Sequence, residues 1–211
     1  MIVCLFSDIH GNLPALEIVL KKTKGVDLYI SLGDVVNYGP WSNECVDLLE
    51  NLNKKILLIG NHEQNFISNN YPGNNIIAKT FHKFCIDKFN RIKEIEAYVE
   101  ELEFEGFKLI HTINNQIIFP DSDIVPDQNI IIGHSHKQFI TNIDGYKIVN
   151  PGSVGQNRTY INEINYIIWN TEKEKFKECS IVYDVDYVIN KMESIKYPDI
   201  CINYYKNKKR L

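Results

Sequence analysis

Short apolar runs and helical patterns alternate along the first sixty residues of the chain. Runs of β-branched and other apolar residues predict strands over 2–6, 26–32 and 54–60. Between them, apolar residues at helical spacing predict amphipathic helices over 13–23 and 41–52. This order indicates a parallel sheet with right-handed crossovers. Because ligands bind outside the carboxyl ends of such strands, we expect the three segments that follow the strands to meet at one edge.

The apolar pattern changes after residue 100. Residues 75–100 are mainly helical in pattern, and turn signals such as "NIDGY" and "NTEKEK" then separate shorter β-like runs, as in hairpins. These runs are 104–111, 129–136, 138–143, 146–152, 164–170 and 176–183. The second half of the chain is therefore expected to supply a second sheet that packs on the first.

The end of the chain combines one more helical pattern with a cationic stretch. The segment "DVDYVINKMES" places four apolar residues on one helix face: Val185, Val188, Ile189 and Met192. The stretch "YYKNKKRL" that ends the chain is its only cationic cluster. It is expected to be a solvated tail, and the alternative is a phosphate-binding patch.

Composition restricts the class of protein. The 211 residues suffice for one domain with a full core, so a single domain over 1–211 is expected. Hydrophobic residues make up 44% and charged residues 24%, which is typical of a globular protein. The formal net charge of −4 argues against a dedicated nucleic-acid binder, because such a protein needs a basic face.

The first residues and the cysteines predict a cytoplasmic protein. "MIVCLFSDIHGN" has no basic segment and only five consecutive apolar residues after the initial Met, so we expect neither a signal peptide nor a membrane span. The five cysteines are an odd number without C-x-x-C spacing, which favours reduced, structural thiols. No membrane partner is expected.

The histidines carry the strongest chemical signal. Five of the six follow predicted strands in polar loops: His10, His62, His111, His134 and His136. The sixth, His82, lies in a helical pattern and is expected to be packed there. Any one of the five alone would more often be structural. Together with Asp8, Asp34 and Asn61 they form a set of carboxylate, imidazole and amide donors.

This donor set has a chemical meaning. Carboxylate, imidazole and amide oxygen without thiolate suit Mn²⁺, Fe²⁺, Co²⁺ or Zn²⁺. Eight residues are too many for one ion. Two ions about 3.5 to 4 Å apart that share a bridging carboxylate would use them all, and this arrangement is typical of two-metal hydrolysis at phosphorus.

Five motifs occur in a fixed order along the chain. They are D-x-H at Asp8 and His10, "GD" at 33–34, "GNHE" at 60–63, the lone His111, and "GHSH" at 133–136. In this order they resemble the calcineurin-like metallophosphoesterases, and the resemblance covers residues 2 to about 158. "NPGSVGQ" at 150–156 and "YDVDYVIN" near the end are similar to the small bacterial and archaeal branch of that family.

The resemblance implies a fold and a metal site. The fold is a four-layer α/β/β/α sandwich of two mixed sheets flanked by helices. Two divalent metal ions are implied, with Mn²⁺ first and Fe²⁺, Zn²⁺, Co²⁺ or Ni²⁺ as alternatives. The ligands of the first metal would be Asp8, His10 and His136. Those of the second metal would be Asn61, His111 and His134, with Asp34 as the bridge.

The resemblance also implies a reaction. A hydroxide that bridges the two ions would attack phosphorus in line, and His62 would remain uncoordinated as the catalytic residue that stabilises the transition state or protonates the leaving oxygen. The implied substrate is a small-molecule or nucleotide phosphodiester. A homo-oligomer is compatible with the sequence, and nucleic acid is a less favoured partner.

Several residues depart from better-known branches of the family. Protein phosphatases carry G-D-x-V-D-R-G, whereas "GDVVNYGP" has Asn37 and Tyr38 at the last D and R, which argues against protein dephosphorylation. His134 follows His111 by only 23 positions, where relatives often insert helix, so a shallow, open site that suits a diester is expected.

Two further residues are candidates for substrate binding. Arg158, just after "NPGSVGQN", is a candidate for a phosphate contact, although a surface or ion-pair role is more common for such a residue. Asn12 is a second candidate, although an asparagine in a loop more often forms a turn.

Three rival functions use the same fold. A phosphomonoesterase or protein phosphatase would share the metal chemistry. A nuclease would need a basic face, and its binding would depend steeply on salt. A non-catalytic scaffold usually loses motif residues, yet all eight are present here.

Overall fold

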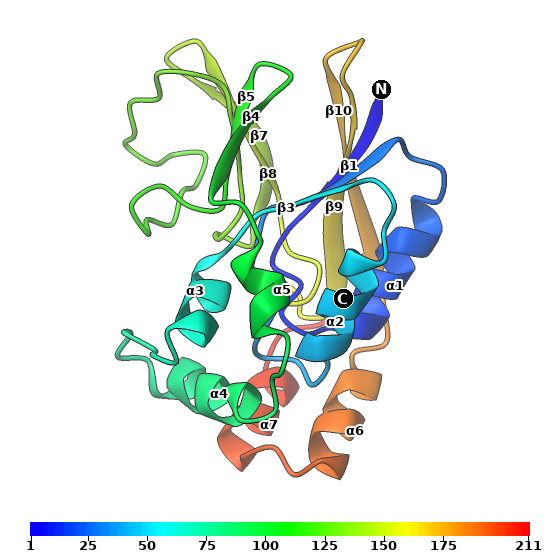
Figure 1. Cartoon of the computed structure of the whole chain (residues 1–211), viewed down its shortest axis with the longest axis vertical. Helices are drawn as coiled ribbons and strands as arrows, with labels where there is room; N and C mark the ends of the chain where they lie inside the picture. Colours follow the sequence, from blue (N-terminus) through cyan, green and yellow to red (C-terminus); the bar gives the residue numbers. More distant parts are fainter.

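The first of two five-stranded sheets carries the N-terminus (Figure 1). The computed structural model describes residues 1–211. In spatial order this sheet contains β10 (Lys175–Val182), β9 (Glu163–Asn170), β1 (Ile2–Phe6), β2 (Leu28–Ser31) and β3 (Lys55–Leu57). β1, β2 and β3 are parallel, and β9 is antiparallel to β1 and β10. The predicted order of strand, helix, strand, helix and strand is confirmed.

The second sheet is also mixed. In spatial order it contains β4 (Glu101–Phe104), β5 (Phe107–Ile110), β6 (Ile130–Ile132), β8 (Tyr146–Pro151) and β7 (Gln138–Ile143). The three central strands are parallel, and β4 and β7 run antiparallel at the two edges. Two mixed sheets flanked by helices confirm the predicted fold class.

Seven helices lie outside the sheets (Figure 1). They are α1 (Leu13–Lys22), α2 (Ser42–Glu50), α3 (Asn61–Ile67), α4 (Ile76–Ile86), α5 (Ile92–Glu96), α6 (Asp186–Ser194) and α7 (Asp199–Lys206). α7 packs against both α4 and α6 at one end of the molecule. No helix is long and apolar enough to cross a membrane.

The pleat of the strands divides the core into layers. Val3 and Leu5 of β1 point between the two sheets, where they pack with Ile131 of β6. Cys4 and Phe6 point to the opposite face and join the core under the helices. Because both faces of β1 are buried, nearly every residue of this strand is apolar, and the sequence shows a continuous apolar run.

Two predictions about the second half need correction. The runs at 164–170 and 176–183 form β9 and β10, which extend the first sheet. The run predicted as one strand over 104–111 is a hairpin of β4 and β5, because Glu105 and Gly106 both adopt positive φ (51° and 75°) and turn the chain.

A loop covers the outer face of the second sheet. Ile113, Ile118 and Ile124 of segment 112–128 pack near Ile130 and Phe139 of that sheet. This short segment contains no helix. Apolar side chains on a loop therefore bury a sheet face that a helix could otherwise cover.

The C-terminal tail is docked, which corrects the expectation of a solvated tail. α7 forms within the stretch, and the backbone N–H of Ile161 donates to the carbonyl of Lys209 (2.9 Å). The backbone N–H of Leu211 donates to Asn162 Oδ1 (2.9 Å), and Arg210 pairs with Asp186 (2.8 Å). The basic residues near the end are thus held against the fold.

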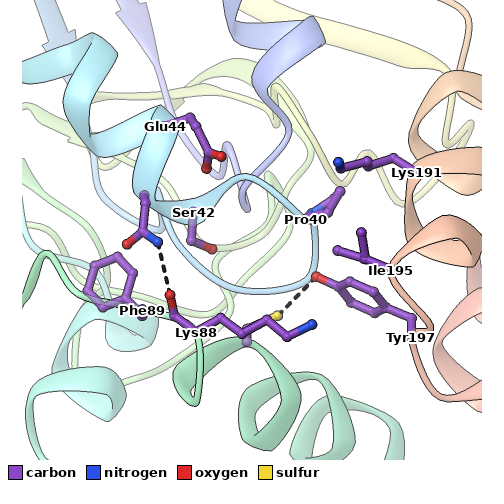
Figure 2. Close-up of a pocket in the computed structure, with 11 residues that line it drawn as sticks. Pro40, Ser42, Glu44, Lys88, Phe89, Lys191, Ile195 and Tyr197 are labelled. Atoms are coloured by element: carbon purple, nitrogen blue, oxygen red, sulfur yellow. Dashed lines mark hydrogen bonds between the residues drawn. The ribbon is translucent and has the colours of Figure 1, made fainter.

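A cavity of about 290 Å³ lies between α2, α4 and α6 (Figure 2). The backbone of Gly39 and Pro40 borders it. Cys85 Sγ lies 3.4 Å from the Tyr197 hydroxyl, and Asn43 Nδ2 donates to the carbonyl of Lys88 (3.0 Å). The cavity contains none of the predicted metal ligands, so it lies behind the functional loops rather than at them.

Candidate metal centre

Loops from both sheets bring the predicted site residues to one edge. Asp8 and His10 follow β1, Asp34 follows β2, and Asn61 and His62 begin α3 just after β3. His111 follows β5, and His134 and His136 follow β6. The parallel strands end at the same edge of each sheet, so residues as far apart in sequence as Asp8 and His136 become neighbours.

A first group of ligand atoms is fully enclosed. Asp8 Oδ1 lies 3.1 Å from His136 Nε2, and the Nε2 atoms of His10 and His136 are 3.2 Å apart. Asp34 Oδ2 lies 3.9 Å from His10 Nε2. Asp8, His10, Asp34 and His136 are all buried and could hold one metal ion.

A second group shares Asp34 with the first. Asp34 Oδ2 lies 3.2 Å from His111 Nε2, and Asn61 Oδ1 lies 3.2 Å from the same nitrogen. Asp34, His111 and His134 offer ligand atoms within 4.8 Å of one another. Asn61 and His134 are only partly buried, so this group faces the outside.

Backbone carbonyls orient three of the imidazoles. Nδ1 of His111 donates to the carbonyl of Leu32 (2.6 Å), and Nδ1 of His136 donates to that of Gln156 (2.6 Å). Nδ1 of His10 lies 3.3 Å from the carbonyl of Val36. A hydrogen bond from Nδ1 turns Nε2 toward the cluster, where it can bind a metal ion once it carries no proton, and this is the usual orientation of a metal-binding histidine.

The backbone around these side chains is strained. Five of the candidate ligands adopt left-handed conformations: Asp8 (φ 55°), His10 (φ 50°), Asp34 (φ 56°), His134 (φ 67°) and His136 (φ 58°). Such residues cost roughly 1 to 3 kcal/mol each and persist only where the surroundings hold them. Their clustering at one edge indicates that the fold maintains this geometry for a function.

Glu63 holds two of the loops together. Its buried carboxylate accepts hydrogen bonds from the backbone N–H groups of Asp34 (2.8 Å), Val35 (2.8 Å), Val36 (3.0 Å) and Gly60 (2.7 Å). Gly60 is required because a methyl group there would overlap the Asp34 carboxylate and backbone. The loops after β2 and β3 therefore form one rigid unit around Asp34.

Opposite charges control protonation in the cluster. Burial alone would raise the pKa of Asp8 and Asp34, but His136 beside Asp8 and His111 beside Asp34 hold both pKa values well below the usual range. Burial would lower the pKa of His111, yet Asp34 raises it to about 10. Burial lowers the pKa of His134 to about 4 and also lowers that of His136.

The cluster fits divalent metal ions. Asp8 Oδ1 is buried without a hydrogen-bond partner, which is costly unless a cation satisfies it. The donors are carboxylate and imidazole, and Asn61 adds an amide oxygen. No cysteine belongs to either group, which favours hard or borderline ions over a structural zinc site.

His62 occupies a separate position beside the cluster. Its Nε2 lies 3.9 Å from Asp34 Oδ2, and its backbone N–H donates to Asp34 Oδ1 (2.9 Å). Asn37 Nδ2 lies 2.8 Å from His62 Nδ1 and donates to it, which leaves the ring proton on Nε2. Burial lowers the pKa of His62 to about 3, so the ring is neutral near pH 7.

Sequence reasoning missed the supporting roles of Asn37 and Glu63. In the sequence, Asn37 is only a departure from the protein phosphatase motif, at the position of the Asp that supports the catalytic histidine there. Glu63 is only the last letter of "GNHE". Both positions were visible in motifs, but neither contact is local in sequence, since Asn37 and His62 are 25 positions apart.

The two predicted substrate-binding residues have different surroundings. Asn12 is fully buried and caps α1, with Oδ1 accepting from Ala15 N–H (3.3 Å). Its Nδ2 donates to the Tyr183 hydroxyl (2.8 Å) and the Gly155 carbonyl (3.3 Å), so its side chain is engaged by contacts within the fold. Arg158 is exposed and borders a cavity that reaches His136.

Comparisons with known proteins agree with this fold and cluster. The family model described as the calcineurin-like phosphoesterase superfamily domain matches residues 1–174. An uncharacterised protein of Methanocaldococcus jannaschii is 30% identical, over 93% of this chain and 94% of that protein. The class defined by the fold and the cluster is thus a metallophosphoesterase. The chain belongs to the calcineurin-like phosphoesterase superfamily, whose members typically depend on divalent metals.

Solved structures show the same fold at lower identity. A metallophosphoesterase from Sphaerobacter thermophilus superposes with a TM-score of 0.77 at 22% identity, covering 98% of this chain and 99% of that one. A hypothetical protein from Pyrococcus horikoshii OT3 gives 0.82 at 17% identity, with 97% of both chains covered. A structure described as a novel archaeal phosphodiesterase gives 0.53 at 21% identity, covering 86% of this chain and all of that one.

Replacing Glu63 tests whether its carboxylate holds the site together. Glu63→Gln keeps the shape but removes one acceptor oxygen and points an N–H₂ at backbone donors. We expect the free energy of unfolding, measured by urea denaturation, to fall by about 2 to 5 kcal/mol. The exposed Glu96→Gln serves as the control and should leave stability within about 0.5 kcal/mol. An unchanged urea midpoint for Glu63→Gln would contradict this role.

Metal binding should release protons at neutral pH. With its pKa raised to about 10, His111 is protonated at pH 7 in the metal-free protein, and it must lose that proton to bind a metal ion. Titration calorimetry with Mn²⁺ in buffers of different ionisation enthalpy should show release of about one proton, and affinity should weaken as pH falls. The variant His82→Gln, outside the cluster, should behave like the wild type. Identical heats in all buffers would contradict the expected proton release and the raised pKa of His111.

Proposed function

We propose that this protein is a metal-dependent phosphodiesterase that hydrolyses a small-molecule or nucleotide phosphodiester. The observation that carries the proposal is the position of Asp34, whose carboxylate belongs to both groups of candidate ligands. A carboxylate shared in this way is typical of centres with two metal ions.

Each group of residues would hold one ion. Asp8, His10 and His136 would bind the first, and Asn61, His111 and His134 the second, with Asp34 between them. When bound, divalent ions lower the pKa of water and offset negative charge on phosphoryl oxygens. Mn²⁺ is the ion we propose first, because carboxylate, imidazole and amide donors suit it.

His62 is the proposed catalytic residue of the chain itself. Asn37 donates to Nδ1, so the ring proton is on Nε2, which lies 3.9 Å from Asp34 Oδ2 at the edge of the cluster. Because burial keeps the ring neutral, His62 is suited to donate a hydrogen bond from Nε2 to an oxygen that gains charge in the transition state.

The surroundings of the site favour a diester over a phosphoprotein. Asn61 and His134 are partly exposed, and segment 112–128 has no helix that could close over them. Asn37, not an aspartate, supports His62, unlike the protein phosphatase motif. The free cysteines fit the proposed cytoplasmic location, where thiols stay reduced.

Hydrolysis of a chromogenic diester tests the proposal. Bis-p-nitrophenyl phosphate and p-nitrophenyl phosphate are compared in Mn²⁺ and after EDTA, and we expect Mn²⁺-dependent cleavage with preference for the diester.

His62→Ala should lower kcat by roughly 10²- to 10⁴-fold while Mn²⁺ still binds. Asp34→Asn should abolish activity, whereas Asp199→Asn on α7 should not change it. Full activity of Asp34→Asn would overturn the proposal. No turnover with Mn²⁺ bound would favour the scaffold function.

The contact between Asn37 and His62 can be tested by itself. Asn37→Ala removes the hydrogen bond to Nδ1, so we expect kcat to fall roughly 10- to 100-fold with little change in KM or Mn²⁺ affinity. Asn37→Asp replaces the donor with an acceptor, so a neutral ring would carry its proton on Nδ1 instead of Nε2 and the rate should stay low. The matched control is Asn43→Ala on α2. A loss of Mn²⁺ affinity equal to the loss in kcat would instead indicate a purely structural role.

A further inference from the structure

A second cavity, of about 180 Å³, borders the metal cluster on the His136 side. Tyr38 and His136 form the border with the cluster, and Arg158, Tyr204 and Lys208 lie on its outer side. Tyr204 and Lys208 come from the C-terminal segment, beyond the residues 1–174 that the family model matches. The cavity is therefore built partly by a segment outside the common catalytic domain.

Two cations line this cavity without an ion-pair partner. Neither Arg158 nor Lys208 forms an ion pair or a side-chain hydrogen bond within the chain. The lysines and arginines that do form ion pairs are Lys55, Arg91, Lys108, Lys206 and Arg210. Burial and the nearby Arg158 both lower the pKa of Lys208. Because like charges held together repel each other, an anion between them would be strongly favoured.

The fold holds these groups in place. Lys208 Nζ lies 4.8 Å from the centre of the Tyr204 ring, and the Tyr204 hydroxyl donates to Gln156 Oε1 (3.3 Å). The carbonyl of Gln156 accepts the hydrogen bond from Nδ1 of His136. A short chain of contacts therefore connects Lys208 with a candidate metal ligand.

The first turn of α4 adds to the positive potential. Asn75, Ile77 and Ala78 border the cavity, and the Asn75 side chain caps the helix by accepting from the N–H groups of Ile77 and Ala78. The positive end of the helix dipole thus faces the same space as the two cations. The two cations and the helix end thus all favour negative charge in this cavity.

The opposite flank of the cluster has a different character. A cavity of about 260 Å³ beside Asn61 is lined by polar residues that include Glu100 and Glu101. Glu101 pairs with Lys108 (2.7 Å) and Glu100 forms no ion pair, so this flank carries negative charge and offers an anion no free cation. A substrate with one reacting phosphate and one further anionic group would therefore bind in a single direction, with the second group toward Arg158 and Lys208.

We infer that the cavity beside His136 binds a second phosphate group of the substrate, between Arg158 and Lys208. The preferred substrates are then phosphoesters that carry more than one phosphate. This inference rests on the proposed function for the catalytic step, but the anion site itself can be measured without metal.

Binding of inorganic pyrophosphate to the EDTA-treated full-length protein tests the site. Titration calorimetry should detect binding by the wild type, and Arg158→Gln and Lys208→Gln should each weaken it at least about tenfold. Arg158→Lys, which keeps the charge, should retain part of the affinity. Lys209→Gln, next in sequence and exposed, is the matched control and should bind like the wild type. No binding by the wild type, or equal losses in Lys208→Gln and Lys209→Gln, would overturn the inference.

A pair of esters distinguishes a substrate phosphate from a free anion. Thymidine 5′-(p-nitrophenyl phosphate) is compared in Mn²⁺ with the same ester carrying a 3′-phosphate. We expect kcat/KM about tenfold higher for the second ester in the wild type and in Lys209→Gln, and a ratio near one in Lys208→Gln. Pyrophosphate binding without any preference between the esters would show a free-anion site and overturn the inference.

The two proposals fail in different ways. If bis-p-nitrophenyl phosphate is cleaved but pyrophosphate does not bind, the second-phosphate site is wrong and the phosphodiesterase proposal stands. If pyrophosphate binds through Arg158 and Lys208 but no ester is cleaved under any metal condition, the catalytic proposal is wrong. The cavity would then bind an anion, but that anion would not be a phosphate group of a substrate.

Discussion

The buried carboxylate of Glu63 is the contact on which the site depends most. It accepts four backbone N–H groups and so fixes the loop after β2 against the start of α3. Asp34, the residue common to both groups of ligands, lies inside this unit in a left-handed conformation. Burial raises the pKa of Glu63, while the hydrogen bonds from the backbone favour its charged form. Without an acceptor at this point, four buried donors would be unpaired and the strained loop could relax.

Burial and the pairing of opposite charges together determine the protonation states in the cluster. Asp8 and Asp34 are enclosed with several imidazoles, and opposite charges keep both carboxylates ionised. His62 escapes this pairing because its closest polar partner is the neutral amide of Asn37. The same small volume therefore contains charged carboxylates suited to metal and a neutral imidazole suited to a hydrogen bond. This difference between neighbouring groups supports separate roles for binding and for catalysis.

The C-terminal segment lies beyond residue 174, where the match to the family model ends. The conserved geometry of a family fold explains a general reaction, but the choice of substrate depends on what surrounds the reacting centre. Here α7 and the residues after it are tied to the loop at 150–162 through Gln156, Ile161 and Asn162. A segment that could have been a solvated tail thus forms one wall of the site, and it brings positive charge to a protein whose net charge is −4.

The sequence by itself determined the βαβ order of the first sixty residues and the candidate ligands. An apolar run predicts a strand, and the polar residue that follows it, such as Asp8, Asp34 or His111, indicates a candidate ligand at the strand end. Both features are local in sequence, so they could be predicted without the tertiary structure. Tertiary structure decided the rest. The addition of β9 and β10 to the first sheet, the burial of Asn12, the support of His62 by Asn37 and the docking of Lys208 all depend on contacts between distant segments. No local pattern encodes such contacts, since they arise from how the two sheets and the last helices pack.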